Sequence, residues 1–150
     1  MTKAEMEFEK YDRRSFQDEI VMPSLEDLFR EREIELHGTS PDFRCYHDEL
    51  RQGFDSFPFG SLAIGDRHVV LICVRTELNL EDIGEHIERL NLFRRYFPEY
   101  EDRKLLGAVA GIVIDEGVDR YAYQQRLFVI GQRGDTVRLL NDADFQPKEW

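Results

Sequence analysis

Residues 57–75 read Phe-Pro-Phe-Gly-Ser-Leu-Ala-Ile-Gly-Asp-Arg-His-Val-Val-Leu-Ile-Cys-Val-Arg. Aromatic and β-branched residues are frequent in both halves of this stretch, and Gly65-Asp66 between them is a turn sequence, so the stretch predicts an antiparallel β-hairpin. The second half is apolar on both faces, as expected for a central strand that is covered on both sides. On the first strand, strict alternation would place four residues on one face: Phe57, Phe59, Ser61 and Ala63.

The chain before the hairpin predicts a helix and a short strand. Apolar residues recur at helical spacing over residues 16–36, and Pro23 inside this run predicts either a bend or the start of a second helix. The Gly-Thr-Ser-Pro sequence at residues 38–41 then interrupts regular structure. A first strand is therefore expected only over residues 43–46, followed by a loop over residues 47–53.

The chain after the hairpin alternates helical and strand patterns. It predicts, in order, a helix ended by Pro98, a buried strand, a short helix and a terminal hairpin: residues 80–97, 104–114, 118–122, and 127–131 with 136–140. The expected fold class is α/β, a single domain with a mixed, twisted sheet of about five strands and helices on both faces.

The chain is acidic, with 20 Lys and Arg against 31 Asp and Glu and a net charge of -11. This balance argues against a broad nucleic-acid surface, although it leaves room for a small basic cleft. Residues 77–102 contain eight acids and three arginines. That segment is interpreted as a solvated helix face or, alternatively, as a docking surface for a basic partner.

The sequence predicts a cytoplasmic protein without a membrane span. The first ten residues alternate in charge and lack the apolar stretch of a secretory signal, and the longest apolar run, residues 105–114, is too short to cross a bilayer. Cys45 and Cys73 are expected to be buried free thiols, because their spacing matches neither a zinc site nor a disulfide framework.

Several strings together carry a resemblance to a known family. They are Met22-Pro-Ser-Leu25, Leu78-Asn-Leu-Glu-Asp-Ile83, Phe93-Arg-Arg-Tyr-Phe-Pro-Glu-Tyr100, Lys104-Leu-Leu-Gly-Ala-Val-Ala-Gly111 and Phe145-Gln-Pro-Lys148. They resemble bacterial proteins of unknown function in which a PD-(D/E)XK nuclease-like domain follows an N-terminal coiled coil. The resemblance covers residues 12–150 and leaves residues 1–11 as a polar leader. It implies a restriction-endonuclease-like αβββαβ core.

The resemblance also implies where the catalytic residues of such a nuclease would lie. The acid of the first hairpin strand falls at Gly60, and the Glu and Lys at the end of the second strand fall at Cys73 and Arg75. An assisting acid on the first helix falls at Asp18, with Glu19 adjacent. Only the cation at Arg75 is kept among the three hairpin positions, so the resemblance implies a degenerate active site.

Magnesium requires hard anionic oxygen ligands, which neither a glycine nor a buried thiol provides. No cofactor is therefore expected. A nuclease with migrated acids remains the alternative: Glu77 follows Arg75 on the same strand face, Asp55 precedes the first strand, and Asp18 lies on the first helix. In that alternative the three carboxylates hold Mg²⁺ and Arg75 positions the phosphate.

The expected function is that of a catalytically inactive nuclease-like domain that serves as a protein interaction module. The first alternative is a metal-dependent DNA endonuclease, and the second is an acidic mimic of nucleic acid that binds a basic protein. The expected partner is another protein or a second copy of the chain, and neither nucleic acid nor a membrane. Association is expected through a sheet edge or through the exposed aromatic ends of the chain, on aromatic residues in otherwise polar segments: Tyr96, Tyr100, Tyr123, Phe145 and Trp150.

Arg75 is expected to be partly buried at the end of an apolar strand, where an unpaired cation is costly. Its expected partner is Glu77 on the same strand face, or Asp18 or Glu19 on the first helix, where a salt bridge would replace the metal. The alternative is that Arg75 extends to water and pairs with nothing.

Overall fold

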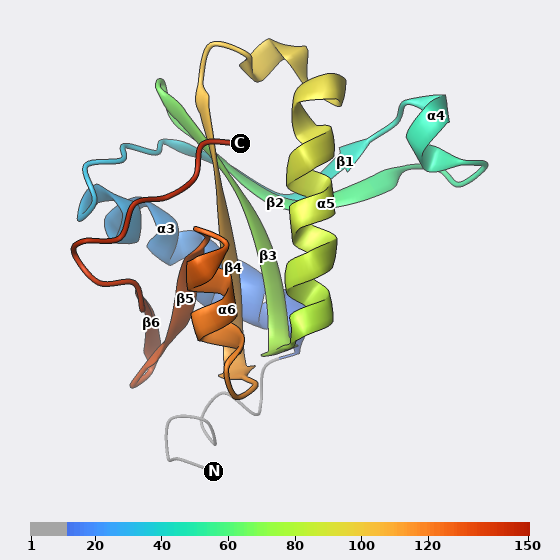
Figure 1. The fold of residues 1–150 in the computed structure, drawn as a ribbon. Helices are drawn as coiled ribbons and strands as arrows, with labels where there is room; N and C mark the ends of the chain where they lie inside the picture. Colours follow the sequence, from blue (N-terminus) through green and yellow to red (C-terminus); the bar gives the residue numbers. More distant parts are fainter. Residues whose placement is uncertain (1–11) are drawn as a thin grey trace.

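The computed structural model describes residues 12–150, which form one six-stranded mixed sheet with helices on both faces (Figure 1). The strands are β1 (Gly38–Cys45), β2 (Phe57–Ile64), β3 (His68–Leu78), β4 (Lys104–Ile114), β5 (Phe128–Arg133) and β6 (Thr136–Leu139). The helices are α2 (Arg13–Ser15), the π-helical segment η1 (Phe16–Val21), α3 (Met22–Arg30), α4 (Asp48–Arg51), α5 (Leu80–Tyr96), the 3-10 turn η2 (Pro98–Tyr100) and α6 (Val118–Gln124). The leader that the sequence predicts over residues 1–11 lies outside the described residues.

The strands lie in the sheet in chain order, β1-β2-β3-β4-β5-β6. β3 pairs with β4 and β4 with β5 in parallel, and the other neighbouring pairs are antiparallel. α5 connects β3 to β4 and α6 connects β4 to β5, as parallel neighbours require a crossover. The sheet has six strands rather than about five, because both strands of the terminal hairpin continue the same sheet.

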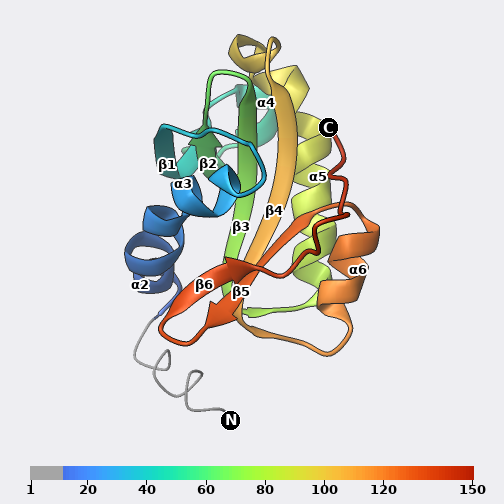
Figure 2. The same ribbon diagram turned by 90° about the vertical axis from the view of Figure 1, so that its left-hand side faces the viewer.

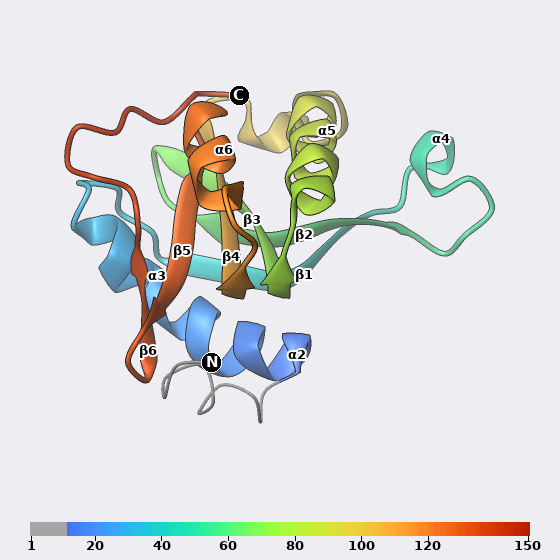
Figure 3. The same cartoon turned by 60° about the horizontal axis from the view of Figure 1, so that its bottom comes forward.

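The two faces of the sheet bury separate hydrophobic clusters, and Figures 2 and 3 show the helices that cover them. On β3, Val70, Ile72 and Val74 pack in the cluster under η1 and α3. The alternate residues Val69, Leu71 and Cys73 pack in the cluster under α5 and α6. The prediction that residues 68–74 form a central strand with cover on both sides is confirmed, and the same alternation holds on β4.

The first helical region ends earlier than its apolar spacing predicts. α3 ends at Arg30, and Glu33 has a positive φ of 62°, which redirects the chain although Ile34 and Leu36 remain buried. Pro23 lies in the first turn of α3, which follows η1 directly. Val21 and Met22 at this junction have right-handed helical dihedrals and Val21 makes no side-chain cap, so the helical run changes from π to α just before Pro23 rather than starting a separately capped second helix.

The region between the first helix and the hairpin also differs from its prediction. β1 runs from Gly38 to Cys45, although only residues 43–46 were expected to form a strand. Pro41 is tolerated within it because β1 is an edge strand with register shifts around this position. The expected loop over residues 47–53 contains α4, which lies on an arm that projects from the body between β1 and β2 (Figures 1 and 3).

β2 does not keep the strict alternation expected from its sequence. Phe57 and Phe59 pack in the cluster under α5, whereas Ala63 packs in the opposite cluster, so these residues do not share one face. Gly60 has a φ of 120° and pairs with Phe43 where the β1–β2 register shifts. A bulge of this kind moves the following side chains to the other face of the sheet.

Within residues 12–150, no helix has both the length and the apolar character needed to span a bilayer.

Candidate functional site

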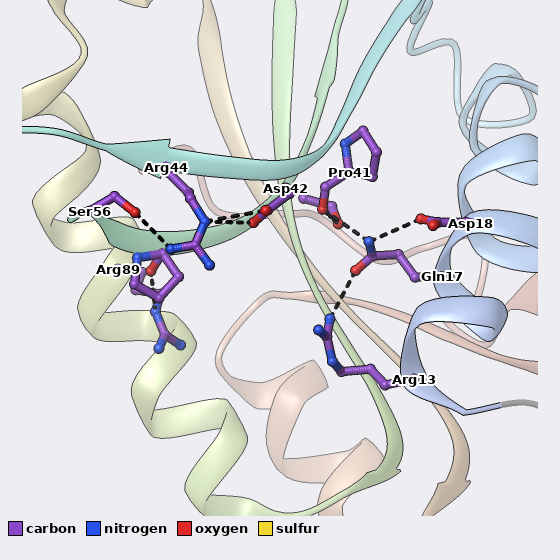
Figure 4. Close-up of polar contacts among 10 residues, drawn as sticks. Arg13, Gln17, Asp18, Pro41, Asp42, Arg44, Ser56 and Arg89 are labelled. Atoms are coloured by element: carbon purple, nitrogen blue, oxygen red, sulfur yellow. Dashed lines mark hydrogen bonds and ion pairs between the residues drawn. The ribbon is translucent and has the colours of Figure 1, made fainter. Parts of the chain in front are cut away.

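A pocket of about 340 Å³ lies where the N-terminal helical region meets the first three strands and α5. Five charged residues line it: Arg13 from α2, Asp42 and Arg44 from β1, Arg75 from β3, and Arg89 from α5. Figure 4 shows Arg13 reaching from the helical segment on one side and Arg44 and Arg89 lying on the other. Elements far apart in the sequence therefore place four guanidinium groups around one hollow.

The same pocket contains all three hairpin positions that the family resemblance singled out. Gly60, Cys73 and Arg75 line it together. The structure thus brings Gly60 on β2 next to Cys73 and Arg75 on β3, as the antiparallel pairing of these strands requires.

The three acids of the nuclease alternative are not brought together. Asp18 accepts a hydrogen bond from Gln17 at 3.2 Å beside the pocket, Asp55 lines a different hollow under the projecting arm, and Glu77 is exposed on β3. Across residues 12–150, no group of three or more His, Cys, Asp or Glu side chains is placed so that it could hold a metal ion.

Gly60 occupies a backbone conformation that excludes a side chain. Its φ is 120°, and a Cβ atom built there would lie 2.7 Å from the carbonyl oxygen of Ile72. Side chains of L-residues rarely adopt this φ, and the nearest atom belongs to backbone that cannot move aside. An acid at this position would require the β2–β3 hairpin to be rebuilt.

Cys73 is an unreactive thiol in this environment. Its side chain is buried, and burial raises the pKa of the thiol to about 11, although the nearby Arg75 guanidinium acts in the opposite direction. The thiol is therefore protonated at neutral pH. A protonated thiol is neither a ligand for a hard cation nor an effective nucleophile.

Arg75 is paired, but with a residue that the sequence did not indicate. Its Nε donates to Oδ1 of Asp82 at 3.3 Å, and its Nη1 donates to the carbonyl of Val74 at 2.9 Å. The expectation of a partner is confirmed. The named partners Glu77, Asp18 and Glu19 are wrong, and so is the alternative of an unpaired side chain.

Asp82 is available to Arg75 because of the way α5 begins. Asn79 is the N-cap of α5, and Asp82 at the third helical position accepts from the Asn79 N–H at 3.0 Å while donating its own N–H to the Asn79 side chain. This capping box fixes the Asp82 carboxylate at the end of β3, where Arg75 emerges. Helix capping, rather than strand spacing, therefore selects the partner.

The other arginines of the pocket are also anchored. Arg44 donates through Nε to Asp42 and through Nη1 to Ser56 at 2.8 Å. Arg89 donates through Nε to the carbonyl of Pro58 at 3.1 Å.

Arg13 approaches the pocket from the helical side, and its Nη1 donates to Gln17 at 3.3 Å. Across residues 12–150, the hydrogen bonds of all four arginines use Nε or Nη1, which leaves their Nη2 amino groups as free donors.

The pocket is a local positive region on an acidic protein. Its charged lining comprises four arginines and one carboxylate, and Asp42 already accepts from Arg44 through both oxygens, at 3.1 and 3.2 Å. The composition left room for a small basic cleft, and the structure contains one. Sequence reasoning identified only Arg75 in it, because Arg13, Arg44 and Arg89 share no motif or spacing that would indicate their convergence.

No protein-family model matches this sequence, and comparisons with curated proteins and with solved structures gave no significant match. The functional interpretation therefore depends on the geometry of the chain itself.

Of the aromatic residues that the sequence offered as an association surface, only Phe145 is buried, and the other four are partly exposed and pack against the hydrophobic clusters. Phe145 is buried and its ring lies 4.9 Å from that of Tyr123, and Tyr96, Tyr100 and Trp150 pack against the cluster under α5. The most exposed large aromatics among the described residues are instead Tyr46 and Phe54, with 68% and 76% of their surface exposed. Both lie on the projecting arm.

Replacing Arg75 by Met is expected to destabilise the fold by about 1 kcal/mol, because the poorly exposed Asp82 carboxylate loses a charged donor and keeps only its helix-cap bond. The matched control is Arg30→Met, which removes an arginine whose ion pairs on α3 are exposed and is expected to cost less than about 0.5 kcal/mol. Urea unfolding of the two variants measures the difference. Equal stability losses would contradict the structural role of the Arg75–Asp82 pair.

Proposed function

We propose that this chain is a catalytically inactive, nuclease-like domain that acts as a protein interaction module. The proposal includes the finer architecture, in which α3, β1, β2, β3, α5 and β4 form the αβββαβ core of the restriction-endonuclease-like fold. The order of these elements and the shared location of Gly60, Cys73 and Arg75 support this interpretation. One observation carries it: the pocket at these positions is lined by arginines where a nuclease requires carboxylates.

The residues present do not fit a magnesium ion. Magnesium is bound through carboxylate and phosphate oxygens with several retained waters, and it activates water and offsets phosphate charge. Gly60 cannot accept an acidic side chain, Cys73 is protonated, and the surrounding guanidinium groups would repel a divalent cation. Asp42 is the one carboxylate on the described pocket wall, and both of its oxygens already accept from Arg44, so the lining does not supply the free carboxylates that this chemistry needs.

The acidic-mimic alternative has weaker support. Most of the acids in residues 77–102 lie on or near α5. Asp82 lies 3.3 Å from Arg75, and Glu85 lies 3.9 Å from Arg89. Part of this charge therefore neutralises arginines within the domain rather than presenting a phosphate-like array to a basic partner.

The purified chain is expected to cleave neither DNA nor RNA in the presence of Mg²⁺ or Mn²⁺. Single-stranded and duplex substrates labelled at one end are incubated with the wild-type chain and with Glu77→Ala and Asp55→Ala variants purified in parallel. The proposal is supported if the amount of cleaved product in every sample equals that in a control without the protein. Metal-dependent cleavage by the wild-type chain that Glu77→Ala abolishes would reject it in favour of the endonuclease.

A further inference from the structure

We infer that the arginine pocket binds the phosphate group of a phosphorylated side chain on a protein partner. This inference rests on the proposed function and specifies how the module recognises its partner. The pocket provides an anion site, and the adjoining hollow under the projecting arm provides a place for residues next to the phosphorylated one.

The donors suit a phosphate group. Arg13, Arg44, Arg75 and Arg89 each keep Nη2 free of hydrogen bonds within the described residues. A phosphate monoester presents three acceptor oxygens and carries about -1.5 to -2 charges at pH 7, more than one carboxylate. Guanidinium groups bind such oxygens through short, charge-assisted hydrogen bonds and often in pairs. Asp42, Asp82 and Glu85 balance part of the charge of Arg44, Arg75 and Arg89, but the four Nη2 groups still offer enough donors for the three oxygens of a phosphate dianion.

The pocket is also preorganised. Arg75 and Arg89 are held by backbone carbonyls of Val74 and Pro58, and Arg44 is held between Asp42 and Ser56. Side chains that are already ordered lose less conformational entropy when a ligand binds, so more of the interaction energy is retained as affinity. A pocket of about 340 Å³ is near the lower end of the range for ligand sites, about 300–1,000 Å³, which suits one side-chain group.

The adjoining hollow favours a peptide ligand. It has a volume of about 680 Å³ and shares Arg44 and Pro58 with the arginine pocket. Its apolar lining comes from the projecting arm, the start of β2 and α5: Leu50, Phe54, Phe57 and Leu92. An apolar residue beside the phosphorylated one would bury Phe54, which is 76% exposed, and so give the exposed aromatic a partner.

The charge distribution disfavours nucleic acid as the source of the phosphate. Polynucleotides bind along tracks of cations that neutralise many phosphates in succession. Here four arginines meet in one pocket on a chain of net charge -11, and the adjoining hollow has a mixed lining, with the acids Asp55 and Glu88 beside Arg44 and Arg51. A single phosphate on an otherwise weakly charged peptide meets the arginines without placing further phosphates against these acids.

Three probes test the inference on the full chain. The first is inorganic phosphate, followed through the arginine side-chain N–H signals by NMR. The second is a degenerate peptide library with a fixed central phosphoserine, compared with the same library carrying serine. The third is a 5′-phosphorylated oligothymidine.

Arg13→Met is the test variant, because Arg13 lines the pocket from the exposed N-terminal helix. Arg14→Met is the matched control, because Arg14 is its exposed neighbour outside the pocket lining.

Phosphate is expected to shift the pocket arginine signals, and the phosphoserine library is expected to bind at least tenfold more tightly than the serine library. Arg13→Met should weaken that binding about tenfold and Arg14→Met should leave it within twofold. The inference would be overturned if phosphate caused no shift, or if only inorganic phosphate bound. It would also be overturned if oligothymidine bound while the phosphopeptides did not, or if the two variants lost affinity equally. If none of the probes binds and no nucleic acid is cleaved, the phosphate-binding inference fails but the proposal of an inactive nuclease-like domain remains. Cleavage of nucleic acid would contradict both.

Discussion

Lowering the pH from 7 to 4 is expected to remove about 3 kcal/mol of folding stability through one buried histidine, His86. Its side chain is fully buried on α5, and Nε2 lies 2.9 Å from the carbonyl oxygen of Leu71 on β3. With Nε2–H donating to that carbonyl, Nδ1 is a buried acceptor without a partner in the described part of the chain. Protonation would place a charge and a second N–H donor without an acceptor in this buried site, so the folded state favours the neutral ring.

Burial lowers the pKa of His86 from 6.5 to about 4, with smaller contributions in the same direction from Arg89 and Arg75 and an opposing one from the Leu71 carbonyl. Above pH 6.5 the ring is neutral in both the folded and unfolded states, so it adds no pH dependence. Between pH 6.5 and 4 the unfolded chain takes up a proton that the folded chain does not. The free energy of unfolding therefore falls across this window and levels off below it.

The measurement is urea unfolding at several pH values between 7.5 and 4. Carboxylates also titrate in acid, so the diagnostic quantity is the difference between variants. His86→Gln keeps an N–H donor for Leu71 without a titrating ring, and it is expected to flatten the slope between pH 6.5 and 4.5. His37→Gln removes an exposed histidine and is expected to keep the wild-type slope. The same slope in all three proteins would contradict the assignment to His86.

The elements that sequence reasoning predicted best are those whose side chains are specified by burial. β3 and β4 are apolar on both faces because helices cover both sides of the sheet, and α5 starts at the Asn79 cap and ends before Pro98. Periodicity and capping are local signals, so they are readable from one sequence. The apolar character of both faces of β3 also led to the prediction of the α/β fold class.

The predictions that failed depended on contacts distant in sequence. β1 extends through Pro41 because its irregular pairing with β2 leaves the Pro41 carbonyl to accept from Gln17 and Ser61. Gly60 interrupts the alternation of side chains along β2 because its φ is positive. A glycine in the sequence permits such a φ but does not show that it occurs. These two irregularities, close to each other in the β1–β2 pair, shape the wall of the arginine pocket.

The composition of the pocket could not be predicted for the same reason. Arg13, Arg44 and Arg89 lie on three elements whose relative positions depend on the β1–β2 bulge and on the crossover through α5. Only Arg75 was indicated, through the resemblance. Residues that share an element or a motif leave a pattern in the sequence, whereas the four arginines of this site come singly from four elements.

Replacing Gly60 by Ala is expected to destabilise the fold by about 3 kcal/mol. A side chain at a φ of 120° costs about 1–3 kcal/mol in backbone strain, and crowding in a packed region adds about 1–3 kcal/mol. The crowding is severe here, because the new Cβ would lie 2.7 Å from the Ile72 carbonyl oxygen, on the neighbouring central strand. Relief would require β2 to move away from β3, at the wall of the arginine pocket.

Gly84→Ala is the matched control for this substitution. Gly84 lies on the exposed side of α5 and has no atom within 4 Å of its built Cβ, so alanine there is expected to stabilise the fold by about 0.5–1 kcal/mol. Urea unfolding of the two variants should therefore give changes of opposite sign. A Gly60→Ala variant as stable as wild type would mean that β2 can adopt a regular backbone at this position. The hairpin could then accept an acid at position 60, and sterics would no longer prevent it from binding a metal there.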